Sequence, residues 1–459
     1  MEAQTTAVGK KVALMNLGCA KNLVDAEVML GKLFTQGYEL TVDPVHADYL
    51  IVNTCGFIRS AKEESIEHIL EMAQIKALYP GKTLVVTGCL AQRYGSELRQ
   101  EIPEIDALVG TGHFQELPQV LLQLQTPLAQ RDYLSENVYL YQEHDARIRT
   151  TQSHTAYVKI AEGCNHLCTF CIIPKMRGRL QSRSIPSIVT EVRQLAREGV
   201  REAILIAQDS TEYGTDLRLR SGLAHLLTQL SEDETTIDWL RVLYLYPSMI
   251  SRTLLDVYAR QEQLCKYFDM PIQHVSDRLL RAMKRGYRQQ TLYRLLDDIR
   301  HRMPEATIRS TFIVGFPGET PADVEALLCF LEQAQLDRVG VFTYSREEGT
   351  PSYHLPGQVP AREAARRRRE VMTLQQEISR RKHRALVGRQ MWALVDTDAT
   401  ETSPALGRLS SQAPDIDGVV QIKGPVSSGD LVLVEITGAT AYDFTACVVQ
   451  PTAAPVERP

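Results

Sequence analysis

The hydrophobic pattern of the first hundred residues repeats one unit three times. In each unit an apolar, strand-like run carries a cysteine near its end, and an amphipathic, helix-like stretch follows. The apolar runs cover residues 12–19, 49–56 and 84–89, and the amphipathic stretches cover 25–34, 61–77 and 92–99. Strands that alternate with helices in this way predict a parallel sheet. We therefore predict an N-terminal α/β domain over residues 10–125.

A second series of alternating strands and helices begins near Thr150, after a polar stretch at 115–150 that is predicted to be a connector. The strand-like runs cover residues 156–160, 203–207, 239–244, 267–270, 307–314 and 338–344. Helix-like stretches separate them, for example at 187–198, 279–284 and 323–333. Six strands over about 200 residues predict a partial (βα) barrel of the TIM type, whose site lies at the carboxyl ends of its strands. This second domain is predicted to cover residues 150–385.

The last part of the chain changes pattern after a proline-containing break at residues 356–360. A long helix-like stretch at 362–384 has Val371, Leu374 and Ile378 on one face. Short β-like runs then cover residues 390–395, 418–422, 431–436 and 444–449. Such runs predict a small all-β barrel over residues 386–455. The predicted fold class is therefore α/β, with a parallel-sheet domain, a partial barrel and a small β-barrel.

The composition is that of an ordinary globular protein, with 44% hydrophobic and 23% charged residues among 459. No apolar run reaches the roughly 18 residues that a membrane-spanning helix needs, so no membrane contact is expected. The first residues lack the basic and apolar regions of a secretory signal, which favours a cytoplasmic location. Because thiols stay reduced there, clustered cysteines bind metal more often than they form disulfides.

Charge is distributed unevenly around a net value of −5. Residues 362–384 hold nine Lys and Arg against three Asp and Glu, whereas residue 386 to the end holds four basic residues against nine acidic ones. An acidic last domain disfavours direct RNA binding and suits a basic partner. The basic helix has two interpretations, contact with RNA or packing between domains with its arginines in solvent.

Six of the nine cysteines form two triplets. Cys164, Cys168 and Cys171 have C-x3-C-x2-C spacing directly after the first predicted barrel strand, which brings three thiolates into one loop. Three thiolates leave one position of a four-coordinate metal site open, and an open position is where chemistry takes place. The alternative is a structural zinc site closed by His166, but this histidine lies between two cysteines with little slack to turn inward.

The second triplet is dispersed, because Cys19, Cys55 and Cys89 each end one strand-like run of the N-terminal repeat. The carboxyl ends of parallel strands form the ligand crevice of an open sheet, so we expect these cysteines at one edge as a second open metal site. The alternative, buried cysteines that pack a helix on a strand, suits one such residue better than three.

The three other cysteines fit neither triplet. Cys329 and Cys447 lie in apolar runs and are predicted to be buried packing residues. Cys265 precedes a predicted barrel strand and shares neither triplet's spacing.

The loop from Cys164 to Cys171 resembles that of the radical S-adenosylmethionine (SAM) superfamily, in which a C-x3-C-x-aromatic-C loop holds a [4Fe–4S] cluster. The resemblance implies that SAM chelates the open iron and yields a 5′-deoxyadenosyl radical on reduction. The run 311–320 is similar to the glycine–proline strand end that approaches adenine, and the run 205–211 falls where family members contact the methionine moiety. The cofactor-binding residues implied by the resemblance are Phe170, Gln208, Asp209, Gly315 and Pro317.

The order of a three-cysteine βα domain, a radical barrel and a C-terminal barrel resembles the methylthiotransferases, whose last domain is of the TRAM type. This resemblance implies a second [4Fe–4S] cluster at Cys19, Cys55 and Cys89, with an open iron as a port for the inserted sulfur. One SAM molecule would methylate the sulfur. A second would generate the radical that activates the substrate carbon.

Several runs resemble the RimO branch of this family, which modifies the β-carbon of an aspartate in the twelfth small-subunit ribosomal protein. They cover residues 165–167, 173–178, 244–247, 268–274, 346–351 and 412–418. The resemblance implies a basic ribosomal protein, or the small ribosomal subunit, as substrate, and a low-potential electron donor. Two alternatives stay open: a tRNA adenosine methylthiotransferase of the MiaB type, and a non-catalytic iron–sulfur or zinc protein that senses redox state or carries clusters.

Overall fold

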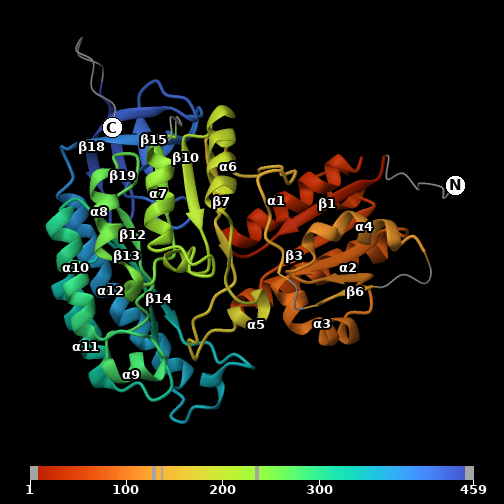
Figure 1. The fold of residues 1–459 in the computed structure, drawn as a ribbon, viewed down its shortest axis with the longest axis horizontal. Helices are drawn as coiled ribbons and strands as arrows, with labels where there is room; N and C mark the ends of the chain where they lie inside the picture. Colours follow the sequence, from red (N-terminus) through yellow and green to blue (C-terminus); the bar gives the residue numbers. More distant parts are fainter. Residues whose placement is uncertain (1–8, 127–130, 136–137, 233–236, 450–459) are drawn as a thin grey trace.

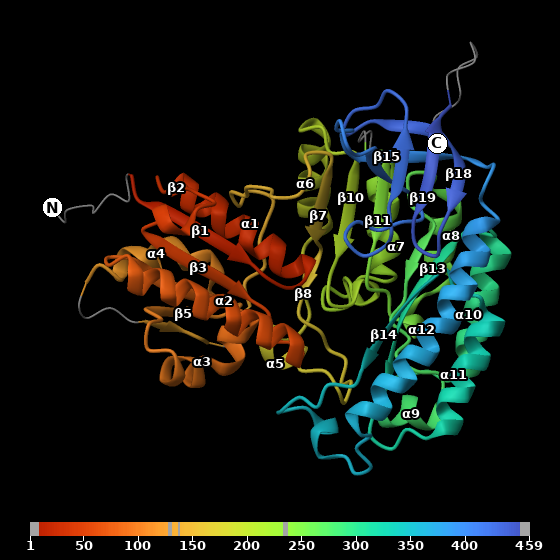
Figure 2. The ribbon, with the colours of Figure 1, turned by 180° about the vertical axis from the view of Figure 1, so that it is seen from behind.

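The structure is a computed structural model and describes residues 9–126, 131–135, 138–232 and 237–449. Three folded units follow one another along the chain (Figure 1). The N-terminal sheet domain lies beside the central partial barrel, and a small closed β-barrel lies at one end of the central unit (Figures 1 and 2). The predicted fold class is confirmed.

The N-terminal domain is built on six parallel strands in the order β2-β1-β3-β4-β5-β6. The strands are β1 (Lys11–Asn16), β2 (Glu39–Leu40), β3 (Tyr49–Thr54), β4 (Thr83–Gly88), β5 (Ala107–Val109) and β6 (Asp132–Tyr133). The helices are α1 (Ala20–Thr35), α2 (Arg59–Leu78), α3 (Cys89–Glu101) and α4 (Leu117–Gln123), with 3₁₀ turns at Pro44–His46 and Phe114–Glu116. Alternate strand residues pack under α1 and α4 on one face and under α2 and α3 on the other.

The predicted connector at residues 115–150 is wrong in part, because it contains α4 and β6. Leu117, Val120 and Leu121 of α4 are buried against the sheet, and β6 pairs with β5 at its edge. A seven-residue helix is too short to show a clear period of 3.6 residues. A two-residue strand is defined by its backbone pairing, which leaves no mark in the sequence.

The central unit is a partial barrel of six strands, which form two three-stranded parallel sheets, β7-β10-β11 and β12-β13-β14. They are β7 (Thr155–Lys159), β10 (Glu202–Ile206), β11 (Trp239–Val242), β12 (Tyr267–Asp269), β13 (Thr307–Val314) and β14 (Arg338–Thr343). A parallel bridge between Leu240 and Leu264 joins the first three strands to the last three.

Helices and short elements connect the barrel strands. The helices are α5 (Ile173–Arg177), α6 (Ile185–Arg197), α7 (Gly222–Glu232), α8 (Arg252–Arg260), α9 (Asp277–Ala282), α10 (Gln289–Arg302), α11 (Pro321–Ala334) and α12 (Ala361–Arg384). The short strands β8 (Ala161–Glu162) and β9 (Gln181–Ser182) form an antiparallel pair, and 3₁₀ turns lie at Ser210–Glu212, Pro247–Met249 and Pro351–His354.

One hydrophobic core spans the N-terminal domain and the barrel. Val24 and Val28 of α1 belong to the same buried cluster as Tyr157, Ile204 and Trp239 of the barrel strands. Helix α1 therefore packs on its own sheet and against the inner face of the barrel. This shared core fixes the domain that carries the dispersed cysteines against the domain that carries the clustered ones.

The C-terminal unit is a closed barrel with the strand order β15-β16-β17-β19-β18. Its strands are β15 (Gln390–Thr397), β16 (Ala405–Leu409), β17 (Val420–Lys423), β18 (Leu431–Ala439) and β19 (Phe444–Val448). Four of these overlap predicted runs, whereas β16 was not predicted. Gly407 interrupts β16, and a Cβ at this position would lie 2.5 Å from the carbonyl oxygen of Leu394 on the neighbouring strand. A short strand with a central glycine has a weak sequence signal.

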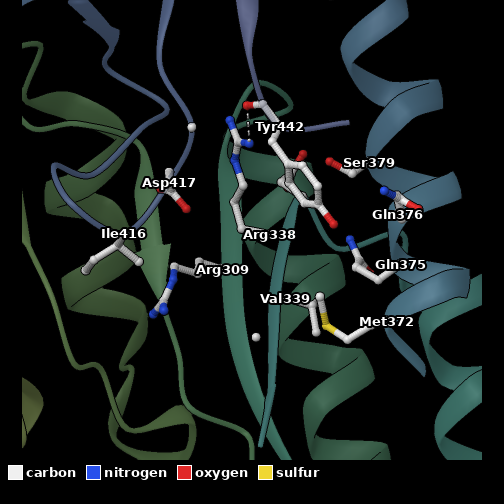
Figure 3. A pocket seen from close by; sticks show the side chains of 13 residues that line it. Arg309, Arg338, Val339, Met372, Gln375, Gln376, Ser379, Ile416, Asp417 and Tyr442 are labelled. Carbon is white, nitrogen blue, oxygen red and sulfur yellow. Dashed lines mark hydrogen bonds between the residues drawn. The ribbon is translucent and has the colours of Figure 1, made fainter. Parts of the chain in front are cut away.

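A seam of buried charges joins the C-terminal barrel to the central unit. Glu202 accepts hydrogen bonds from Arg241 Nε at 2.7 Å and from Arg408 Nη1 of the C-terminal barrel at 2.6 Å. The Tyr267 hydroxyl donates to Asp417 at 2.7 Å. Beside this seam lies a polar cavity of about 130 Å³ between β13, β14, α12 and the C-terminal barrel (Figure 3). In this cavity Arg338 Nη1 donates to the carbonyl oxygen of Tyr442 at 3.4 Å (Figure 3).

The prediction that Cys329 is buried is wrong, because this residue is exposed. Cys329 lies on α11 within an apolar run whose inward face is formed by Leu327, Phe330 and Leu331. The run is apolar around the whole helix, so its composition does not reveal which side faces solvent. Cys265 is buried and Cys447 is half-buried. No helix in the described residues is long and apolar enough to cross a membrane.

We predict a large loss of stability when Glu202, which accepts hydrogen bonds from two buried arginines of the seam, is removed. Glu202→Ala leaves the buried guanidinium group of Arg241 without this carboxylate, whereas Arg408 keeps its hydrogen bonds to Asp396. The free energy of unfolding should fall by roughly 3–5 kcal/mol because a buried charge loses its partner. Denaturant unfolding measures this change. The matched control is Glu63→Ala, which breaks an exposed pair with Arg59 and should have little effect. Equal stability of the two variants would contradict a structural role for the seam.

Candidate functional site

The clustered cysteines lie in a tightly held loop between β8 and α5. The amide of Cys164 donates to the carbonyl of Gly178 at 3.2 Å, and the amide and hydroxyl of Thr169 donate to Met283 and Ala282 at 3.1 and 2.8 Å. Cys164 and Cys168 are buried and Cys171 is half-buried. These bonds anchor the loop at its first cysteine and between its second and third cysteines.

The dispersed cysteines meet at the carboxyl edge of the N-terminal sheet. Cys19 precedes α1, Cys55 follows β3 and Cys89 begins α3. A Cβ at Gly18 would lie 2.8 Å from Cys55 Cβ, so this glycine lets the first loop approach the second. The Cys55 thiol interacts electrostatically with both Cys89 and Cys19. The structure thus brings the three residues together, and their role as ligands stays a prediction.

Several thiols of the two triplets have shifted pKa values, raised at Cys55, Cys164 and Cys171 and lowered at Cys19. Burial raises the pKa values of Cys55, Cys164 and Cys171 to about 12. Such thiols keep their protons at neutral pH in the protein alone, whereas a bound metal displaces the proton and stabilises the thiolate. Two sets of three cysteines also fit iron–sulfur clusters that leave one iron open.

The alternative zinc site is weakened by the position of His166. Its Nε2 lies 2.5 Å from Asp209 Oδ2, and its ring stacks on Tyr246 with the centroids 4.0 Å apart. Donor atoms of Cys164, His166 and Glu212 lie within 4.8 Å of one another, but within the described part of the chain this group contains neither Cys168 nor Cys171. His166 therefore lies with Cys164 and Glu212 rather than with all three clustered cysteines.

Each triplet has one buried arginine that donates to a thiol. Arg177 Nε lies 3.4 Å from Cys89 Sγ, and Arg285 Nη1 lies 3.4 Å from Cys168 Sγ. Arg177 sits at the end of α5, directly after the clustered triplet, yet it contacts the dispersed one. Hydrogen bonds to ligand sulfurs help to set the reduction potential of an iron–sulfur cluster.

Arg177 also belongs to a buried network that spans the two domains. Its Nη1 donates to Asp25 of α1 at 2.8 Å and to Glu162 of β8 at 3.1 Å. Lys159 of β7 pairs with the same two carboxylates, at 2.7 Å from Glu162. Burial alone would raise the pKa of Glu162, but Lys159 and Arg177 outweigh burial and lower it to about 2. The carboxylate is therefore ionised at neutral pH.

The residues expected to contact SAM lie at the same end of the barrel as the clustered triplet. Gln208 and Asp209 follow β10, and Gly315 and Pro317 follow β13. Gln208 donates to Glu162, and its buried Oε1 accepts no hydrogen bond among the described residues. Phe170 packs beside a small buried cluster that includes Phe316. Gly315 has a φ of 77°, which favours glycine.

Sequence reasoning did not single out Lys21, Lys159, Arg177 or Arg285. Lys21 is only 9% exposed, and its Nζ lies 3.3 Å from the centre of the Tyr244 ring. A cation–π contact supplies about 0.5–2 kcal/mol, less than the several kcal/mol that burial of an ammonium costs. The sequence offers one indication for each of two of these residues, namely closeness to a triplet cysteine. Lys21 lies two residues after Cys19, and Arg177 lies six residues after Cys171.

Three family models match successive parts of the chain. Residues 11–110 match the uncharacterized protein family UPF0004, residues 158–331 match the radical SAM superfamily, and residues 387–449 match the TRAM domain. Among curated proteins, the ribosomal protein uS12 methylthiotransferase RimO of Trichlorobacter lovleyi is 45% identical over 96% of this chain and 98% of its own length. That of Myxococcus xanthus is 45% identical over 97% and 93%. The chain belongs to the RimO family.

Solved structures support the fold of this RimO family member. The radical SAM methyltransferase TsrM of Kitasatospora setae superposes with a TM-score of 0.56 at 16% identity, over 75% of this chain and 77% of TsrM. The cobalamin-dependent radical enzyme OxsB gives a TM-score of 0.51 at 12% identity, over 75% of this chain and 54% of OxsB. RimO family membership makes the chain a radical SAM enzyme and implies two [4Fe–4S] clusters and SAM as cofactors.

The two triplets predict two separable iron sites. Anaerobic reconstitution should load about eight irons per chain, and replacing Cys164, Cys168 and Cys171 together with alanine should leave about four. Replacing Cys19, Cys55 and Cys89 should have the same effect. Iron analysis and visible absorbance measure both results. The control Cys329→Ala, at an exposed position on α11, should keep the full iron content. Bound zinc without visible absorbance would contradict the assignment.

Proposed function

We propose that this RimO family member transfers a methylthio group to the β-carbon of an aspartate in ribosomal protein uS12. The single observation that carries the proposal is the contact of Arg177 with Cys89, because it joins the loop of one cysteine triplet to the other. A reaction that uses both sites on one substrate needs them held together. The near full-length similarity to proteins named uS12 methylthiotransferases supports the choice of substrate.

We assign the radical-generating cluster to Cys164, Cys168 and Cys171, and the auxiliary cluster to Cys19, Cys55 and Cys89. When bound, these clusters and SAM would supply the sulfur port and the radical chemistry, while the protein supplies binding and orientation. The SAM contacts are assigned to Phe170, Gln208, Asp209, Gly315 and Pro317.

The chain's own residues have three tasks at this site. Arg177 and Lys159 neutralise Asp25 and Glu162, and so hold the two domains in register. Arg285 donates to Cys168 and keeps its other hydrogen bonds with Tyr287 and Pro271. Gln208 offers a buried carbonyl oxygen as an acceptor, which suits the amino group of SAM.

The acidic last domain favours a protein substrate over tRNA. A domain that grips tRNA should be basic, because phosphate neutralisation dominates affinity for nucleic acid. Residues from 386 to the end instead hold nine acidic residues against four basic ones. Direct RNA binding by the TRAM domain is therefore not part of the proposal. A basic ribosomal protein, alone or in the small subunit, complements this charge.

The proposed chemistry sets two further conditions. Reduction of the radical cluster needs a low-potential electron donor. Modification of a ribosomal protein needs access to the cytoplasm, where we expect the enzyme to act.

The substrate is tested by deleting the gene and analysing both candidate products by mass spectrometry. The methylthio mass should disappear from the uS12 aspartate, while methylthiolated adenosine in tRNA should stay at the parental level. Return of the uS12 modification on complementation serves as the control. Loss from tRNA with uS12 unchanged would favour the MiaB-type alternative and contradict the proposed substrate.

The two cluster sites should separate in cysteine variants. Cys164→Ala should abolish SAM cleavage, because it removes a ligand of the radical cluster. Cys55→Ala should retain 5′-deoxyadenosine formation and lose methylthio transfer. Chromatography of 5′-deoxyadenosine and mass spectrometry of uS12 measure the two steps, with Cys329→Ala as a control that retains both. Equal loss of cleavage in the first two variants would show that the two roles are misassigned.

A further inference from the structure

Lys21 is a buried cation beside the dispersed cysteine triplet. It occupies the first turn of α1, two residues after Cys19, and its side chain reaches across to Tyr244 of the central barrel. Tyr244 follows β11, so it lies at the carboxyl end of the barrel, where the clustered triplet also lies. The ammonium is close enough to Cys19 and Arg177 for direct electrostatic interaction with both.

Within the described part of the chain Lys21 forms no ion pair with a carboxylate, and the ionisable groups that interact favourably with it are Cys19 and Tyr244. The neighbouring cations Arg177 and Lys159 share Asp25 and Glu162. Arg285 has no carboxylate partner among the described residues either, but it donates to the Tyr287 hydroxyl, the Pro271 carbonyl and Cys168 Sγ.

In contrast, the contacts of Lys21 are the Tyr244 ring and hydroxyl. A buried ammonium without a carboxylate is costly unless a ligand brings the missing negative charge.

The residue under Lys21 is held in an unusual conformation. Tyr244 has a φ of 63°, which is uncommon for a residue with a bulky side chain. Its amide donates to Asp269 Oδ2 at 3.1 Å, and its carbonyl accepts from the Ser210 amide at 2.9 Å. Such conformations cluster at functional sites, where surrounding contacts maintain them. The Tyr244 ring is therefore fixed in place as a platform for the ammonium.

We propose that Lys21 binds the carboxylate of the substrate aspartate and so selects an anionic side chain. This inference rests on the proposed function, because it assumes an aspartate substrate. An aspartate carboxylate supplies the missing counter-charge, whereas a neutral adenine base does not. Cys19 beside it is exposed, so the site is open to solvent on the side of the auxiliary triplet. Lys21 would then hold the substrate beside the auxiliary site.

The competing explanation is that Lys21 only balances the charge of the auxiliary site. In that case its removal changes the reduction potential of the cluster at Cys19, Cys55 and Cys89, and it does not change recognition of the substrate. Two readouts separate the explanations: the affinity for substrate and the midpoint potential of the auxiliary cluster.

The experiment compares the reconstituted wild-type enzyme with Lys21→Met and Lys21→Arg. Equilibrium binding is measured with purified uS12 that carries either aspartate or asparagine at the modified position. The wild type should bind the aspartate form more tightly by about tenfold or more, the loss expected when one partner of a buried charge pair is removed. Lys21→Met should bind both forms equally, and Lys21→Arg should retain part of the preference.

The control variant is Lys10→Met, which removes a lysine that pairs with Asp48 at the surface of the same domain. It should keep the wild-type preference. Iron content should be unchanged in Lys21→Met, which shows that a lost preference does not come from a lost cluster.

A Lys21→Met enzyme that still prefers the aspartate form, or one whose auxiliary potential shifts while its preference persists, would overturn the inference. The failure of the proposed function looks different. A wild-type enzyme that leaves uS12 unmodified would refute the substrate itself, whatever the variants bind.

Discussion

The arrangement of the whole site depends on four buried charges between the first two domains. Asp25 comes from α1, Lys159 and Glu162 come from β7 and β8, and Arg177 comes from α5. Removing one partner of such a set strands a charge away from water, which costs several kcal/mol. The four groups pair with one another across the boundary between the two domains. The network therefore fixes the position of the two domains relative to each other. The cysteine loops lie next to the network residues in the sequence, so the network also fixes the loops.

Helix α1 transmits this constraint to the dispersed triplet. Cys19 immediately precedes the helix, Asp25 lies on its second turn, and Val28 packs into the core that the two domains share. A shift of the barrel relative to the sheet would have to break the ion pairs and open that core. The hydrophobic contacts bury most of the surface between the two domains. The paired charges fix how the domains are aligned, because hydrophobic contacts are non-directional and permit sliding more readily than ion pairs do.

The sequence predicts local periodicity well and predicts contacts between distant segments poorly. Strand β13 matches the predicted range at 307–314, where β-branched and aromatic residues are frequent and the burial alternates along most of the strand. The polarity of parallel strands is enough to predict that the three dispersed cysteines meet at the carboxyl edge of the sheet, at Cys19, Cys55 and Cys89. Arg177 could not be found in this way, since its partners Asp25 and Cys89 lie 152 and 88 residues away along the chain. The strands β6 and β16 were not predicted from the sequence. Strand β6 has only two residues, and the short strand β16 has a glycine at its centre.

The basic helix shows how a charge run can mislead when it is considered alone. Residues 362–384 suggested either RNA contact or arginines in solvent, yet Arg367 is buried and donates to Glu319 at 2.9 Å. The same Glu319 accepts the amide of Gly315, in the segment expected to approach SAM. A Cβ at Gly315 would lie 2.5 Å from the Cβ of Ala364 on this helix. Part of the positive charge of α12 thus serves to shape a strand end of the barrel, which leaves only its outward arginines free to meet a partner.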